Sequence, residues 1–104
     1  MYDKKISDEL LCILNKLWKK DRHSYRIIFK KIEEILNCDN IDSYKNMRHP
    51  LQAYNEVHIN THFVLAFRLE ENTVKFFDYQ HHDDIQDRLE HRRYDFSEEE
   101  DSQN

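Results

Sequence analysis

Histidine is the residue type whose number and spacing most suggest chemistry in this sequence. The chain has seven histidines. Five of them fall between residues 49 and 82: His49, His58, His62, His81 and His82. An imidazole titrates near neutral pH, so one histidine can remove a proton while another delivers one. Histidine also binds transition metals, and it often lies on the solvent face of a strand without a function. Three interpretations therefore compete: acid–base catalysis, a metal site and an ordinary polar surface.

The metal interpretation has ligands but lacks a recognisable spacing. The later histidines lie close in sequence to Asp78, Asp83 and Asp84, and together they offer enough side chains to bind a metal ion. The sequence contains neither the HExxH nor the CxxC spacing that marks many metal sites. The pattern therefore favours acid–base chemistry without a metal or other cofactor. Stoichiometric zinc or nickel in a metal analysis would favour the alternative.

Cleavage of RNA is a reaction that uses paired histidines without a metal. The 2′-hydroxyl attacks the adjacent phosphate, a base takes its proton, an acid protonates the departing 5′-oxygen, and a cation stabilises the added negative charge. Arg48 and Arg68 lie close enough in sequence to the histidines to supply that cation. Arg68 has an equally simple alternative, which is an ion pair with Glu70 or Glu71. Composition alone does not select this reaction.

The N-terminal third of the chain predicts a helical hairpin. Ser7 is a good N-cap for a first amphipathic helix that ends near Lys20, and Asp21 is a good N-cap for a second. Asn37 begins a turn-like segment that ends the second helix. Because the connection is so short, the two helices should pack antiparallel.

Residues 54–79 predict three strands that bring the histidines together. Strands are expected over residues 54–59, 62–69 and 73–79, with turns at residues 60–61 and 70–72. Residues 2–6 are a candidate edge strand. The expected fold is α+β: an N-terminal helical hairpin packed on a twisted antiparallel sheet of three to four strands, with the other sheet face free. His58 and His62 would flank the first turn, and His81 and His82 would follow the last strand.

Length and charge predict one domain with an acidic extension. We expect residues 1–86 to form the domain and residues 87–104 to be a charged, partly disordered C-terminal extension. The extension has 3 basic and 7 acidic residues, so it contributes -4 of the net charge of -5. An acidic chain is not a typical nucleic-acid binder. No apolar segment is long enough to span a membrane, and with two cysteines and no recognisable signal peptide we expect a cytoplasmic protein.

Three sequence motifs in residues 44–86 resemble one known family. The first is HPLQA at residues 49–53, which is followed by a strand containing His58. The second is LAFRL at residues 65–69, at the end of an apolar strand. The third is a histidine motif that ends at His82, close to the C-terminus. With two helices before them, these motifs resemble the RelE superfamily of toxin–antitoxin toxins, and most of all its YafQ branch, over residues 2–86.

This resemblance implies an activity, partners and a set of residues. Such toxins are small cytoplasmic ribonucleases that cut mRNA, generally on the ribosome and without a metal, and a cognate antitoxin silences them. His62 stands where the YafQ branch has a catalytic aspartate, Phe63 where it has a functional tryptophan, and Gln86 where related members have an aromatic residue. The resemblance and the chemistry together assign His49, His58, His62 and His82 to catalysis. They assign Arg48, Phe63, Arg68 and His81 to substrate binding.

Two other hypotheses remain open at the level of sequence. The same superfamily includes ParE-type toxins, which bind DNA gyrase and cut no RNA, and a catalytically degenerate member of the RelE fold is also conceivable. The histidines at matching positions favour the ribonuclease. The acidic net charge and the changes at His62 and Gln86 favour the alternatives.

Overall fold

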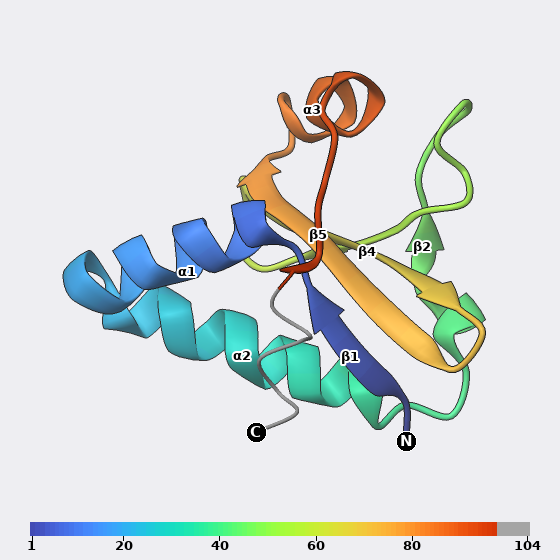
Figure 1. Cartoon of the computed structure of the whole chain (residues 1–104), viewed down its shortest axis with the longest axis horizontal. Helices are drawn as coiled ribbons and strands as arrows, with labels where there is room; N and C mark the ends of the chain where they lie inside the picture. Colours follow the sequence, from blue (N-terminus) through green and yellow to red (C-terminus); the bar gives the residue numbers. More distant parts are fainter. Residues whose placement is uncertain (98–104) are drawn as a thin grey trace.

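Two helices follow one another near the N-terminus with a single residue between them. In the computed structural model of the chain, which describes residues 1–97, α1 spans Asp8–Lys20 and α2 spans Arg22–Leu36. The Ser7 side chain accepts a hydrogen bond from the Leu10 N–H, and the Asp21 side chain accepts one from the Ser24 N–H. Each helix therefore begins at the N-cap that the sequence predicts, and the pair forms the expected hairpin (Figure 1).

The sheet beside this hairpin has five strands. They are β1 (Asp3–Ile6), β2 (Lys45–Asn46), β3 (Asn55–His58), β4 (Phe63–Glu70) and β5 (Thr73–His81), in the order β1-β5-β4-β3-β2. The predicted antiparallel meander is confirmed in β3, β4 and β5, and the predicted edge strand is confirmed in β1. However, β1 runs parallel to β5, which makes the sheet mixed rather than antiparallel. The two-residue β2, which follows a 3-10 turn at Ile41–Ser43, has no apolar alternation and was not predicted.

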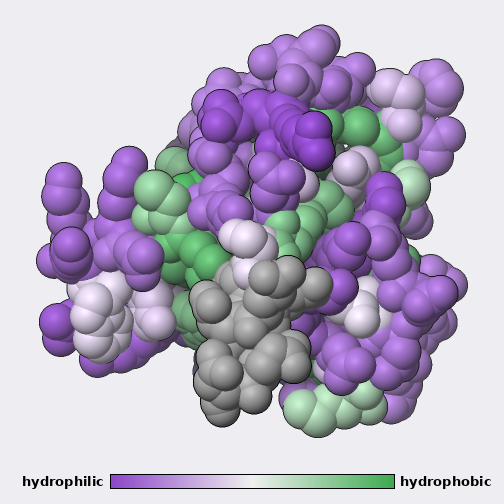
Figure 2. All heavy atoms as spheres, viewed as in Figure 1, coloured by the Kyte–Doolittle hydropathy of each residue, from purple (hydrophilic) through white to green (hydrophobic). Residues whose placement is uncertain are grey.

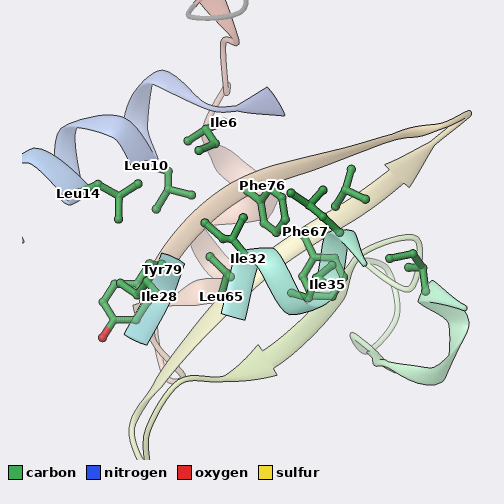
Figure 3. Close-up of a cluster of buried hydrophobic side chains, with 13 residues drawn as sticks. Ile6, Leu10, Leu14, Ile28, Ile32, Ile35, Leu65, Phe67, Phe76 and Tyr79 are labelled. Atoms are coloured by element: carbon green, nitrogen blue, oxygen red, sulfur yellow. The ribbon is translucent and has the colours of Figure 1, made fainter. Parts of the chain in front are cut away.

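The main hydrophobic core lies between the helices and one face of the sheet. Figure 3 shows leucines of α1 and isoleucines of α2 directed toward Leu65, Phe67 and Phe76 on β4 and β5. All three of these sheet side chains are fully buried. Burial of this apolar surface holds the sheet against the helices.

The opposite face of the sheet is covered as well, so the expectation of a free face is wrong. A second cluster of buried side chains lies there: Met47, Leu51, Val64, Ala66, Phe77, Ile85 and Leu89. These side chains come from the segment after β2, from the sheet and from α3 (Ile85–His91). Hydrophilic residues dominate the surface in Figure 2, and hydrophobic residues are visible between them near the middle of the molecule.

The described part of the C-terminal extension packs against the sheet. The boundary expected at residue 86 falls within α3. Beyond α3, the rings of Tyr94 and Phe96 lie 5.7 and 5.1 Å from the ring of Phe77, measured between centroids. Part of the extension that was expected to be disordered, residues 98–104, lies outside the described residues. Within residues 1–97, no helix is long and apolar enough to cross a membrane.

We expect Ser7→Ala to lower the free energy of unfolding by about 2 kcal/mol. Ser7 is fully buried, and its Oγ donates to the carbonyl oxygen of Phe77 at 2.6 Å while accepting from the Leu10 N–H at 3.0 Å. Alanine leaves a buried donor and a buried acceptor without their partner. Urea denaturation measures the loss. Ser24→Ala is the matched control, because within the described part of the chain the Ser24 hydroxyl bonds only to the exposed Asp21, and its removal should have a smaller effect.

Candidate active site

Strands β3, β4 and β5 place histidines at one end of the sheet. β3 ends at His58, β4 begins at Phe63 and β5 ends at His81, and Phe63 pairs with His81 across the sheet. In the turn between β3 and β4, the Asn60 side chain accepts hydrogen bonds from the N–H groups of His62 and Phe63, both at 2.9 Å. The His82 N–H donates to the His62 carbonyl oxygen at 2.7 Å. The predicted convergence of His58, His62, His81 and His82 at one end of the sheet therefore occurs.

A cavity of about 500 Å³ opens at this end of the sheet. Its walls come from β2, β3, the turn between β3 and β4, and the start of α3. The lining residues are Lys45, Met47, Arg48, Glu56, His58, Thr61, His82, Asp83, Ile85 and Gln86. In Figure 1, α3 and the segment that follows β2 extend from the sheet on the same side. His58 and His82, which are predicted to act together, line this one cavity.

Asp83 places a carboxylate beside the ring of His82. Its Oδ1 lies 3.0 Å from the His82 Nδ1. A carboxylate at this distance can stabilise positive charge that develops on the imidazole. The sequence indicated Asp83 only as one of several possible metal ligands. Its place directly after His82 was the signal for this pairing, but contact between neighbours in sequence depends on rotamers that sequence does not fix.

The cationic side chains at the cavity differ in their availability. The Lys45 Nζ lies 3.6 Å from a carboxylate oxygen of Glu56, which partly neutralises it. Among residues 1–97, no carboxylate forms an ion pair with Arg48, whose side chain lines the cavity. Arg48 is therefore the cation at this site that is best placed to bind a phosphate.

Arg68 does not reach the cavity. It forms an ion pair with Glu70 and lies over the ring of Tyr54, with its Cζ 5.2 Å from the ring centroid. Lys75 binds the same carboxylate at 2.9 Å. The hydrogen bond from Lys75, with a further one from Arg68, holds the pKa of Glu70 below its usual value. The ion pair that the sequence offered as the alternative for Arg68 is thus present.

His49 and Phe63 also lie outside the cavity lining. The His49 Nδ1 is 3.4 Å from the Gln52 side-chain nitrogen, on the exposed segment next to Arg48. The Phe63 ring stacks on Tyr79 at 5.1 Å between centroids, and both lie on the helix side of the sheet beside Leu17. Burial raises the pKa of Tyr79.

His62 and His81 lie beside His82 rather than in the cavity. The ring centroids of His62 and His81 are 5.6 Å apart, and those of His81 and His82 are 4.5 Å apart. The structure therefore separates the predicted residues into three groups. Arg48, His58 and His82 line the cavity; His62 and His81 form a cluster with His82; and His49, Phe63 and Arg68 lie outside both. Gln86, at the position where the resemblance places an aromatic residue, lines the cavity.

Solved structures share the fold of this chain. The chain matches YoeB in its complex with YefM from Staphylococcus aureus with a TM-score of 0.67 at 13% identity, over 79% of this chain and 98% of that one. It matches YafQ from E. coli strain BL21(DE3) with a TM-score of 0.59 at 12% identity, over 82% of this chain and 98% of that one. The fold is therefore the α+β fold of YoeB and YafQ.

Sequence relatives place the chain in a family. It is 47% identical to "Putative toxin RelE4" of Methanocaldococcus jannaschii, over 82% of this chain and 90% of the relative. It is 42% identical to an uncharacterized protein of Methanosarcina mazei, over 82% of this chain and 99% of the relative. No protein-family model matches the chain. The chain belongs to the RelE family of toxins, as its sequence motifs predict.

Proposed function

We propose that this toxin is an endoribonuclease that cuts mRNA without a metal, by attack of the 2′-hydroxyl on the adjacent phosphate. The observation that supports this proposal most directly is the cavity that His58, His82 and Arg48 line together. A base, an acid and a cation around one phosphate are the groups that this reaction needs.

The pairing of His82 with Asp83 favours His82 as the base. Its Nε2 takes the proton of the 2′-hydroxyl, and the carboxylate of Asp83 stabilises the imidazolium that forms. His58, protonated, gives its proton to the 5′-oxygen as the bond between that oxygen and phosphorus breaks. The products are a 2′,3′-cyclic phosphate and a 5′-hydroxyl. We assign no step to His49, His62, Phe63, Arg68 or His81.

Partners follow from the same proposal. The neighbouring structures include YoeB in complex with YefM, a toxin–antitoxin pair. We propose that this chain likewise pairs with a cognate antitoxin and acts on mRNA at the ribosome in the cytoplasm. Expression of the chain alone should then arrest growth, and co-expression with the adjacent open reading frame should restore it.

A cleavage assay on translated mRNA tests the function. Purified protein is added to a translating extract, and new 5′ ends of the mRNA are mapped by primer extension. The ribonuclease proposal expects discrete new ends that carry a 5′-hydroxyl. Absence of new ends at protein concentrations that arrest growth would overturn it. Inhibition of gyrase supercoiling in parallel would then support the ParE-type alternative, which the net charge of -5 favours.

We expect Arg48→Ala to reduce the rate of mRNA cleavage by about 10- to 100-fold, because a charge-assisted hydrogen bond to phosphate contributes about 1.5–3 kcal/mol. Lys45→Ala is the matched control in the same cavity. Since Glu56 already pairs with Lys45, loss of the lysine should lower the cleavage rate less. Single-turnover cleavage of a defined mRNA on stalled ribosomes measures both variants. An equal effect of the two substitutions would argue against a specific role for Arg48.

A further inference from the structure

Three histidines form a compact cluster next to the cavity. His62 comes from the turn before β4, His81 from the end of β5 and His82 from the residue after it. One ring nitrogen from each lies within 4.8 Å of the others. The rings of His62 and His81 are nearly parallel, with 9° between their planes. His62 and His82 are exposed, so an ion from solvent can reach them.

The spacing of the three nitrogens suits a transition metal after a small movement. A tetrahedral zinc ion holds histidine nitrogens at about 2.0–2.1 Å, which places them about 3.4 Å from one another. Exposed imidazoles can close the remaining distance by side-chain rotation. Three imidazoles with one position open to water form a ligand set that zinc accepts.

Asp83 lies where it can support two of the ligands. One of its carboxylate oxygens is 3.5 Å from the His81 Nδ1, and the other is 3.0 Å from the His82 Nδ1. Ligating histidines commonly donate their second ring N–H to a carboxylate, which fixes the ring orientation. At present the His81 Nδ1 accepts from the Asp83 backbone N–H at 3.1 Å. If a metal bound the other ring nitrogen of His81, the ring proton would lie on Nδ1. The Asp83 carboxylate could then accept a hydrogen bond from that N–H.

We propose that His62, His81 and His82 bind one divalent transition-metal ion such as Zn²⁺, and that the bound ion inhibits the toxin. The proposal that the metal binds depends only on the geometry of the cluster. Inhibition rests on the proposed function, because an ion bound to the His82 imidazole competes with the proton that this ring would take from RNA. The bound ion is therefore regulatory and takes no part in the cleavage reaction.

Cobalt and zinc titrations of the full chain test the binding. Co²⁺ should give the visible absorption of a four-coordinate site with one equivalent bound, and Zn²⁺ should displace it. His62→Ala and His81→Ala should each weaken binding at least tenfold. The matched controls remove histidines outside the cluster: His58→Ala, and His91→Ala on the exposed face of α3, should bind as the wild type does. Metal affinity that is unchanged in His62→Ala and His81→Ala would overturn the proposed metal site. An equal loss of affinity in His91→Ala would overturn it as well.

The cleavage assay separates the two proposals. Micromolar Zn²⁺ should suppress mRNA cleavage by the wild-type protein, and chelation should restore it. Each cluster variant is compared with its own metal-free rate, and His81→Ala should need at least tenfold more Zn²⁺ for half inhibition. If the protein binds the metal but cuts no RNA, the ribonuclease proposal is wrong and the metal-site proposal stands. Cleavage that Zn²⁺ does not affect, in a protein that binds it at this cluster, would contradict inhibition alone.

Discussion

Replacement of His82 by alanine should lower the rate of mRNA cleavage by about 10²- to 10⁴-fold, the range that general acid–base catalysis contributes. His82 lines the cavity and carries a carboxylate behind its ring, so it is the side chain best prepared to take a proton. The same substitution should abolish growth arrest on expression of the toxin alone. Primer extension on translated mRNA and colony counts after induction measure the two effects.

The variant needs a control for loss of a histidine and a control for folding. His91→Ala removes an exposed imidazole that pairs with Asp87 on α3, away from the cavity lining, and should cut mRNA at the wild-type rate. His58→Ala should lose activity by a factor similar to that of His82→Ala. Circular dichroism and urea denaturation check that each variant is folded. Folded His58→Ala and His82→Ala proteins that still cleave mRNA and arrest growth would show that the catalytic assignment is wrong.

The fold was largely predictable because its main elements have regular patterns. The helices follow the apolar period of 3.6 and begin at capping residues, and β4 and β5 are apolar runs bounded by turn residues. β2 has two residues, too few to show an alternation. The parallel pairing of β1 was not predictable either, because the direction of pairing depends on how the helices return the chain to the sheet.

The site was predictable where the topology alone decides it. β3 and β5, on either side of β4, finish at the same end of the sheet and so bring His58 and His82 to one cavity, as the meander implies. Arg68 sits on a strand of the same meander, but the length of β4 places it beside Tyr54 and Glu70 instead. The sequence did not predict that α3 and the segment after β2 form a wall of the cavity. The few apolar residues of these segments have no regular helical or strand spacing, so the sequence does not show that they are buried.

A buried carboxylate under α3 leads to the largest expected effect on stability. Asp78 on β5 is fully buried and receives hydrogen bonds from the Arg88 Nε at 2.8 Å and the Tyr94 hydroxyl at 2.5 Å. Burial, and then the bond to Asp78, raises the pKa of Tyr94, so this hydroxyl remains a donor at neutral pH. Arg88 also binds Glu9 of α1 at 2.6 Å. These contacts attach α3 to both the sheet and the helical hairpin.

We expect Arg88→Met to lower the free energy of unfolding by about 3–5 kcal/mol, because the change leaves Asp78 charged and buried without its cation. Methionine keeps much of the volume of the arginine stem, so the loss reports the unpaired charge more than a cavity. Urea denaturation at neutral pH measures it. Arg92→Met is the matched control, since Arg92 is exposed and its side chain pairs only with Glu9 among residues 1–97, and it should cost less than about 1 kcal/mol.

The double variant Arg88→Met, Asp78→Asn tests the cause. If the cost of Arg88→Met comes from a stranded carboxylate, an amide at position 78 should restore about half of the lost stability or more, because a neutral group is far cheaper to bury. With the amide oxygen in the place of Oδ1, the Tyr79 N–H, which donates to Asp78 at 2.9 Å, can still bond to it, and the Tyr94 hydroxyl, which now donates to Oδ2, can rotate to accept from the amide nitrogen. A double variant that is less stable than Arg88→Met alone would show that α3 depends on packing by the arginine rather than on charge neutralisation. Since α3 forms one wall of the cavity, variants that loosen it should also cleave mRNA more slowly, even though Arg88 does not line the cavity.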